Sequence, residues 1–182
     1  MLLIDYFDDL ERDVCRKING LSRAPVVREF FAAVSKLGDY SAYVILGLVC
    51  AADERVHGPT LLAQSVITAA VGVAVYKLLK ERLVRERPFI RHGDIVCRTA
   101  PLDRYSFPSG HTLHAVSFAI LFGNALPELL WILLPFVILV GASRVILGLH
   151  YPSDVAVGAL LGASLALLSE WCAQALGYSV WA

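Results

Sequence analysis

The chain has 182 residues, a length that suggests a single domain. Hydrophobic residues make up 57% of it and the mean hydropathy is +0.63, above the apolar share of about 45–50% in soluble proteins, which argues against a soluble globular protein. The 16 Lys and Arg residues balance the 16 Asp and Glu residues, so net charge indicates no nucleic-acid partner. We expect an all-α, integral membrane helical bundle that forms one domain over residues 1–182.

The first 37 residues are expected to be amphipathic or interfacial, ahead of a transmembrane core over residues 38–182. Residues 1–19 have apolar side chains at three- and four-residue steps, which predicts a helix. The apolar positions are Leu3, Phe7, Leu10, Val14 and Ile18. Such a helix either lies in the membrane interface or packs on the bundle. A second apolar stretch, residues 26–37, is expected to end at Gly38 and Asp39.

About five transmembrane helices are expected after this segment. They cover residues 40–52, 58–80, 109–126, 129–149 and 152–175. The first is the weakest candidate, because 13 residues rise only about 20 Å against a hydrocarbon core of about 30 Å. The polar and basic residues 82–107, which include two prolines, predict a long loop.

Three polar clusters interrupt this apolar sequence. They are Lys80 with Arg87 and Pro88, then Ser109, Gly110 and His111, then Ser143 and Arg144 with His150 and Asp154. Each cluster lies where one predicted span ends or the next begins. With five spans, all three are expected at the same face of the membrane.

The cations in these clusters can bind a phosphate group. Arg87 and Arg144 can each donate paired hydrogen bonds to phosphate oxygens, and Lys80 can act as a point charge. A charge inside a membrane span is costly, so Arg144 is expected to be functional. A lone lysine at a helix end is most commonly an ordinary basic residue of the membrane interface, and this interpretation applies to Lys80 taken by itself.

Ser109, Gly110 and His111 are expected to open a helix. Backbone amides at a helix N-terminus favour an anion, and a glycine lets that backbone approach a phosphate closely. Without its neighbours the same sequence is more often a plain serine cap followed by a turn glycine. The neighbouring cations favour the phosphate-binding interpretation.

His150 and His111 can supply a nucleophile and a proton donor. One imidazole nitrogen can attack phosphorus while the other histidine protonates the departing oxygen. Asp154 lies four residues after His150 and can hold the second nitrogen of a nucleophilic histidine. The residues alone leave open which histidine has which role.

The three clusters together resemble the signature of the type 2 phosphatidic acid phosphatase (PAP2) superfamily. The resemblance covers roughly residues 77–160, and every position of the pattern Lys-x6-Arg-Pro, Pro-Ser-Gly-His and Ser-Arg-x5-His-x3-Asp is filled. It implies that His150 forms a phosphohistidine, that Asp154 orients it and that His111 is the general acid. It further implies phosphoryl binding by the following residues: Lys80, Arg87, Ser109, Gly110 and Arg144, with support from Ser143.

No metal or other cofactor is expected. The resemblance implies metal-independent chemistry, and His111 with His114 gives only an HxxH pair without a third ligand in register. His114 is expected to pack within its helix. The basic residues of the loop either form a rim that attracts anionic lipid headgroups or are simply solvated and set the topology. They are Arg82, Arg85, Arg91 and Arg104.

The function expected is that of a membrane phosphatase that hydrolyses a lipid phosphate, either a monoester or a pyrophosphate. Candidate substrates are phosphatidic acid, phosphatidylglycerol phosphate and polyprenyl (pyro)phosphates. One alternative is a phospholipid-binding or transport protein without enzymatic activity. Another is an enzyme similar to vanadium-dependent haloperoxidases, which are much longer soluble proteins.

The partners expected are membrane lipids and a phosphorylated lipid substrate, in a bacterial plasma membrane. Of the 16 Lys and Arg residues, Arg55 alone falls in a loop at the opposite face from the three clusters. The positive-inside rule therefore predicts a cytoplasmic active site, with a periplasmic site as the alternative. Gly158 and Gly162 favour close helix packing within the bundle over dimerisation.

Overall fold

The computed structural model describes residues 2–101 and 103–180, with side chains from residue 9 onward in the first helix. Apart from isolated β-bridge residues, such as the pair Glu86 and Tyr105, the regular elements in these ranges are helices. The α-helices are α1 (Leu2–Gly20), α2 (Pro25–Leu37), α3 (Tyr40–Ala51), α4 (Gly58–Leu83), α5 (Pro88–Arg91), α6 (Gly110–Ala125), α7 (Leu130–Ile146) and α8 (Pro152–Ala175). Short 3-10 helices η1 (Leu21–Arg23) and η2 (Pro127–Leu129) precede α2 and α7.

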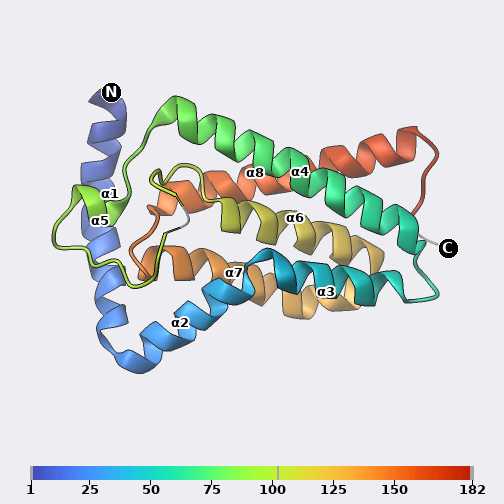
Figure 1. Cartoon of the computed structure of the whole chain (residues 1–182), viewed down its shortest axis with the longest axis horizontal. Coiled ribbons are helices and arrows are strands. Elements are labelled where there is room, and N and C mark those ends of the chain that lie inside the picture. The colour runs from blue at the N-terminus through green and yellow to red at the C-terminus, as the bar shows by residue number, and fades with distance from the viewer. Residues whose placement is uncertain (1, 102, 181–182) are drawn as a thin grey trace.

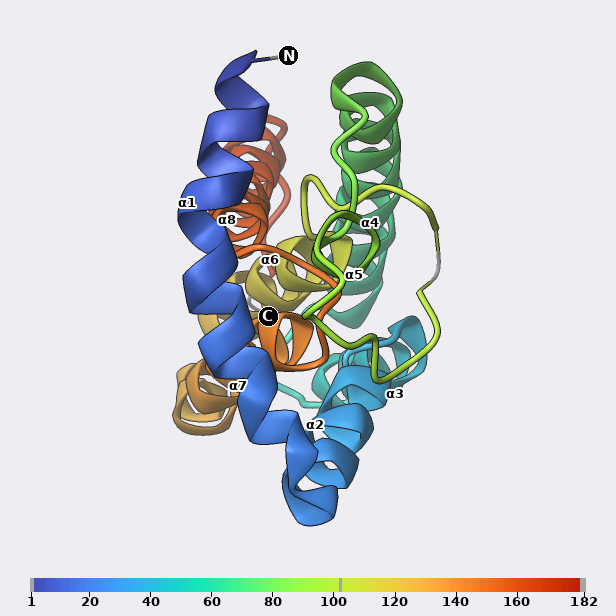
Figure 2. The same cartoon turned by 90° about the vertical axis from the view of Figure 1, so that its left-hand side faces the viewer.

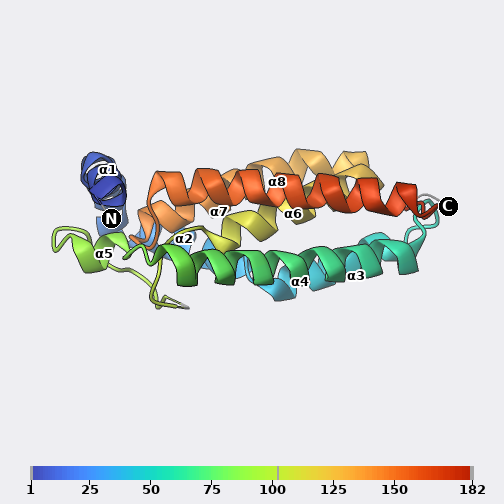
Figure 3. The same cartoon turned by 90° about the horizontal axis from the view of Figure 1, so that it is seen from above.

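Helices α3, α4, α6, α7 and α8 run along the long axis of the molecule (Figure 1). The view from above places α6 between α3 and α4 on one side and α7 and α8 on the other (Figure 3). Most side chains of α6 are buried for this reason. The predicted all-α membrane fold is confirmed.

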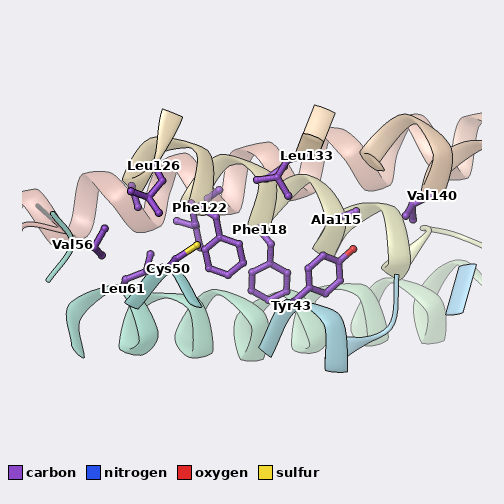
Figure 4. Close-up of a cluster of buried hydrophobic side chains, with 14 of the residues drawn as sticks. Tyr43, Cys50, Val56, Leu61, Ala115, Phe118, Phe122, Leu126, Leu133 and Val140 are labelled. Carbon is purple, nitrogen blue, oxygen red and sulfur yellow. The ribbon is translucent and has the colours of Figure 1, made fainter. Parts of the chain in front are cut away.

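Aromatic side chains fill the middle of the bundle (Figure 4). Tyr43 of α3 stacks on Phe118 of α6 with ring centroids 4.6 Å apart, and Phe118 stacks on Phe122 at 5.5 Å. Burying such rings contributes more than apolar area alone, by about 0.5–1.5 kcal/mol for each pair. This core holds α3 against α6.

The structure differs from the prediction in the number of full-length spans. Three helical segments are long and apolar enough to cross a membrane: Gly58–Leu83, Pro127–Ile146 and Pro152–Ala175. The pair α2 and α3 passes the same test together, although the chain bends by 56° between them, which gives up to four spans rather than five. The expected break at Gly38 and Asp39 is the site of this bend.

Two of the five predicted spans are too short to cross a bilayer alone. Helix α3 has 12 residues, and α6 has 16, which corresponds to about 24 Å of rise. Because α6 lies among the other helices, its neighbours provide the apolar environment that lipid would otherwise supply. Exposed apolar side chains instead lie on the outer helices, such as Trp131 on α7 and Leu160 on α8.

The glycine pair of α8 packs against α6. A Cβ atom at Gly158 would lie 2.5 Å from the carbonyl oxygen of Ser109, and one at Gly162 would collide with the carbonyl oxygen of Leu113. Ser117 of α6 donates a hydrogen bond of 2.9 Å to the Gly162 carbonyl. The small residues thus serve a contact within the bundle, as expected.

Helix α1 lies across one end of the bundle (Figures 1 and 2). Cys15 is buried against the cluster that contains Ile95, Val145 and Tyr151, whereas Leu10 is 61% exposed. Part of the predicted apolar stripe therefore faces outward while the helix also packs on the bundle. Leu3 and Phe7, which the prediction included, lie outside the described side chains.

The same end of the bundle collects the helix termini that carry the three polar clusters. Helices α4 and α7 end there, and α6 and α8 begin there (Figure 1). The expected convergence of the clusters at one face is therefore seen in the fold. Arg55 lies at the other end, where its guanidinium contacts Glu128 at 2.6 Å.

Candidate active site

A cavity of about 260 Å³ opens at the end of the bundle where these helix termini meet. Six of the nine predicted site residues line it: Lys80, Arg87, Gly110, His111, Arg144 and His150. They come from the end of α4, the segment before α5, the start of α6, the end of α7 and the loop before α8. Residues separated by up to 70 positions in the sequence thus share one small polar cavity.

His150 is held in the loop between α7 and α8. The amides of Leu149 and His150 both donate to the carbonyl oxygen of Arg144, at 3.0 and 3.1 Å. Gly148 permits this loop because its φ is +78° and a Cβ atom there would lie 2.7 Å from the Val96 carbonyl oxygen. The backbone therefore fixes His150 at the cavity wall.

The two ring nitrogens of His150 face different partners. Nε2 lies 3.3 Å from Nη1 of Arg87, and Nδ1 lies 3.4 Å from Oδ2 of Asp154. The second distance is at the long end of hydrogen bonding, and Nδ1 forms no hydrogen bond within the described part of the chain. Burial and the charges of Arg87, Arg144 and Lys80 lower the pKa of His150 well below its usual value. The ring is therefore neutral at neutral pH, with a lone pair available on one nitrogen.

Asp154 does not line the cavity but lies directly behind His150. Its side chain is fully buried at the start of α8. Oδ2 accepts a hydrogen bond of 2.9 Å from the amide of Tyr151, which caps the helix. Oδ1 accepts a hydrogen bond of 2.6 Å from Nη1 of Arg85.

His111 occupies the first turn of α6 at the cavity wall. Its Nε2 lies 3.0 Å from Oδ1 of Asp39, the residue before α3. The His111 side chain is 12% exposed, in contrast to the enclosed His150. His111 and His150 therefore each have a carboxylate near one ring nitrogen.

Two of the three predicted cations share a carboxylate partner, and the third bonds to a hydroxyl group. Nζ of Lys80 donates to both carboxylate oxygens of Asp103 at 2.8 Å, and Nη2 of Arg87 donates to the same carboxylate at 2.8 Å. Arg144 is 3% exposed, bonds to the hydroxyl of Ser35, and its Nε has no hydrogen-bond partner within the described ranges. An anion in the cavity would meet all three cations.

Comparison with known proteins adds independent information to this geometry. The sequence model of the PAP2 superfamily matches residues 61–178, which is more than half of the chain and is the range in which the nine predicted site residues lie. The chain belongs to the PAP2 superfamily. The prediction that the chain belongs to a family of membrane lipid phosphatases is confirmed. Enzymes of this family are phosphoric ester hydrolases.

Curated members of the superfamily are similar over different lengths. The bacitracin transport permease protein BcrC of Bacillus licheniformis is 33% identical over 181 residues, covering 94% of this chain and 85% of the relative. The decaprenylphosphoryl-5-phosphoribose phosphatase of Mycobacterium tuberculosis is 40% identical over 106 residues, covering 56% of this chain and 55% of the relative. The chain thus spans about half the length of the mycobacterial protein that it matches.

Solved structures support the same assignment. The crystal structure of Aquifex aeolicus LpxE superposes with a TM-score of 0.76 at 26% identity, covering 87% of this chain and 93% of LpxE. A transmembrane PAP2-type phosphatidylglycerolphosphate phosphatase from Bacillus subtilis gives a TM-score of 0.68 at 24% identity, covering 95% of each chain. The second likeness concerns the fold alone.

Two predicted phosphate ligands of this PAP2 protein, Ser109 and Ser143, do not line the cavity. The hydroxyl of Ser109 lies 2.9 Å from that of Thr112 and caps α6, and the hydroxyl of Ser143 donates to the carbonyl oxygen of Val140 at 2.6 Å. Both side chains are fully buried. In this conformation their contribution is to the helix ends that carry His111 and Arg144.

Sequence reasoning missed two acidic residues of the site. Asp39 and Asp103 both line the cavity but belong to no motif and come from a bend and a loop. Only weak features of the sequence could have identified them as site residues. Asp39 follows a helix-breaking glycine, and Asp103 lies in a stretch rich in basic residues. Tyr40, Tyr43 and Tyr76 complete the wall.

Arg85 fits neither of the two interpretations of the loop arginines, because it is 6% exposed and contacts Asp154. The side chain of Arg104 is 70% exposed, which both interpretations allow. His114 packs as expected, stacking on Phe118 and lying 3.1 Å from the hydroxyl of Tyr40, although it also reaches the cavity.

The described residues contain no group of three His, Cys, Asp or Glu side chains that could hold a metal ion. Metal-independent chemistry remains a prediction from the family resemblance.

Proposed function

We propose that this PAP2 protein hydrolyses the terminal phosphate of a membrane lipid through a phosphohistidine at His150. The observation that carries the proposal is the arrangement around His150: a neutral, enclosed imidazole with Nε2 beside the cations and Nδ1 facing a buried carboxylate. A nucleophilic histidine needs an unprotonated nitrogen toward phosphorus and a partner for its other nitrogen.

The first step is attack by Nε2 of His150 on phosphorus. An N–P bond forms as the bond from phosphorus to the lipid oxygen breaks, and the departing oxygen takes a proton from His111. Asp154 stabilises the positive charge that develops on the imidazole. Lys80, Arg87 and Arg144 stabilise the negative charge of the phosphoryl oxygens, and this stabilisation is stronger in a cavity that holds little water.

Water completes the reaction in the second step. His111, now unprotonated, accepts a proton from the water as its oxygen attacks phosphorus. The N–P bond breaks, inorganic phosphate leaves and His150 returns to its neutral form. Asp39, 3.0 Å from Nε2 of His111, orients this ring in both steps.

A lipid substrate is supported by an apolar groove that continues from the cavity. The groove has a volume of about 160 Å³, runs between α3 and α4 and shares Tyr40 and Tyr43 with the polar cavity. Val44, Leu48 and Val66 line it, and each is more than half exposed on the outside of the bundle. A phosphate headgroup can therefore occupy the cavity while an acyl or prenyl chain leaves sideways between these helices.

Phosphatidic acid, phosphatidylglycerol phosphate and polyprenyl (pyro)phosphates all have this form. Relatives of this chain include a decaprenylphosphoryl-5-phosphoribose phosphatase, an undecaprenyl-diphosphatase and a lipid A 1-phosphatase. We propose this class of substrate, with the active site at the cytoplasmic face of a bacterial plasma membrane. The charge distribution supports that orientation, because Arg55 lies alone at the opposite end among the 16 Lys and Arg residues.

The deciding experiment is phosphate release by detergent-purified protein from a panel of these lipids in the presence of EDTA. We expect release that resists EDTA and disappears in His150→Ala, with the thermal stability of the variant preserved. Activity retained by His150→Ala would overturn the proposed mechanism.

A transport function is the second candidate, because the Bacillus licheniformis relative is named a permease. Lipid binding without phosphate release from any member of the panel, by folded wild-type protein, would favour that function over hydrolysis.

Orientation is tested by thiol labelling in intact cells. Cys97 is partly exposed at the active-site end, and Glu54 is exposed in the loop at the other end. A variant that retains only Cys97 should resist a membrane-impermeant maleimide, whereas Glu54→Cys in a background without Cys97 and Cys172 should react. The reverse pattern would place the site in the periplasm.

A further inference from the structure

Arg85 is a buried cation that the proposed reaction does not use directly. It lies in the segment between α4 and α5, and its side chain is 6% exposed. Nη1 donates to Oδ1 of Asp154 at 2.6 Å and lies 2.7 Å from the hydroxyl of Ser153. The guanidinium carbon lies 4.0 Å from the centre of the Tyr151 ring, at stacking distance.

Glu11 of α1 holds the other side of the same guanidinium. Nη2 of Arg85 donates to Oε2 of Glu11 at 2.8 Å. Glu11 also accepts two hydrogen bonds from Ser153 at the start of α8, from its amide at 2.7 Å and from its hydroxyl at 2.5 Å. The Glu11 side chain is 15% exposed, so this ion pair is shielded from solvent.

The contacts form a chain from the N-terminal helix to the predicted nucleophile. Glu11 contacts Arg85, Arg85 contacts Asp154, and Asp154 faces His150. Asp154 is fully buried, and a buried carboxylate without a compensating charge is strongly destabilised. Arg85 supplies that charge on Oδ1, which leaves Oδ2 directed at Tyr151 and His150.

We propose that Arg85 is a positioning residue that fixes the Asp154 carboxylate toward Nδ1 of His150, and that Glu11 makes α1 part of the active site by holding Arg85. The inference rests on the proposed role of His150 and Asp154. Arg85 is not among the groups that bind the phosphate or react in the proposed mechanism; it acts by holding the Asp154 carboxylate in one orientation.

Removal of Arg85 should slow the chemical step rather than weaken substrate binding. For Arg85→Gln we expect kcat to fall by about 10- to 100-fold, the range found when outer partners of oriented histidines are removed from metal sites. KM should change by less than about threefold, because the phosphate-binding cations remain. Arg85→Lys keeps the charge but not the planar fork and should recover part of the loss.

The pH profile separates positioning from general stability. The charged or titratable groups near Asp154 are Arg85 in the α4–α5 segment, the neutral His150 in the preceding loop, Glu11 on α1 and, at longer range, Lys80 on α4. Without Arg85 the Asp154 carboxylate binds a proton more readily, so the acidic limb of kcat should move to higher pH. Arg104→Gln is the control, since Arg104 is an arginine of the loop between α5 and α6 whose side chain is 70% exposed, and its profile should be unchanged.

A double-mutant cycle tests whether Arg85 acts through Asp154. When Asp154→Asn is already present, adding Arg85→Gln should lower kcat by less than about a further threefold, because the carboxylate that Arg85 positions is already altered. Full additivity of the two effects would overturn the proposal. Glu11→Gln removes the α1 contact alone and should lower kcat by a few-fold, which keeps the proposal testable if Arg85→Gln does not fold.

A spectroscopic readout makes the test independent of turnover. In protein labelled with 15N-histidine in detergent micelles, Arg85→Gln should shift the His150 ring signals, assigned by comparison with His150→Gln, and Arg104→Gln should not. Unchanged His150 signals and an unchanged kcat in a folded Arg85→Gln protein would overturn the positioning role. Activity retained by His150→Ala would instead remove the proposed mechanism itself.

Discussion

The carboxylate oxygens of Asp103 lie 2.8 Å from Nζ of Lys80. Lys80 is one of the cations that are proposed to bind the substrate phosphate. Arg87 donates to the same carboxylate, so one loop residue satisfies two predicted phosphate ligands. Burial opposes ionisation of Asp103, but the hydrogen bonds and charges of Lys80 and Arg87 outweigh it and lower its pKa. Asp103 is therefore an anion at neutral pH and competes with phosphate for these cations.

Neutralising this carboxylate should tighten the binding of phosphate-like anions. For Asp103→Asn we expect the inhibition constant of orthovanadate to fall by about tenfold, which corresponds to about 1.4 kcal/mol. Inhibition of lipid hydrolysis provides the measurement, and Asp94→Asn, in the same loop but paired with Arg12, is the control. A weaker inhibition in Asp103→Asn would mean that Asp103 helps to form the anion site.

Folding stability should depend on pH through His150. Because burial and nearby cations lower its pKa in the folded state, the unfolded chain binds a proton first as the pH falls. The stabilising effect of neutral His150 is therefore present above about pH 6.5 and declines below it, by up to about 1.4 kcal/mol per pH unit.

Thermal unfolding in detergent between pH 7.5 and 5 measures this effect. His150→Gln cannot titrate, so its Tm should fall less steeply than that of the wild type, while the contributions of the other four histidines are common to both proteins. Parallel curves for the two proteins would contradict the assignment of a neutral, buried His150.

The contact between α6 and α8 should tolerate no side chain at Gly158. In Gly158→Ala the new Cβ atom would meet the backbone carbonyl of Ser109, which cannot rotate away, and overpacking of this kind costs about 1–3 kcal/mol. We expect a lower Tm and reduced activity, because Ser109 leads directly into His111. Gly93→Ala is the control, since nothing lies within 4 Å of its Cβ position.

The groove between α3 and α4 should determine the use of long-chain substrates. Val44→Trp places a large ring in the groove at a position that is 59% exposed, so the protein should still fold. We expect KM to rise by several-fold for a long-chain lipid phosphate and to stay unchanged for a dibutyryl analogue. Leu160→Trp, on the outer face of α8, should affect neither substrate; equal effects of the two changes would argue against the groove.

Local patterns in the sequence determined the helices and the candidate chemistry. An uncharged run from Gly58 specified α4, proline at 152 marked the first residue of α8, and Gly38 marked the bend between α2 and α3. These features act within a few residues, through hydropathy, fixed φ angles and helix breaking, and so they can be read without a fold. The three motifs likewise identified the histidines, cations and carboxylate.

Tertiary structure decided what each of these residues contacts. The sequence left Arg85 among the loop arginines, yet the fold buries it between Glu11 and Asp154, which lie 74 and 69 residues away. Asp39 and Asp103 reach the cavity from a bend and a loop that carry no motif, and α6 is short because its neighbours replace lipid around it. Ion pairing and burial depend on distances between separate segments, and those distances are set only when the helices pack.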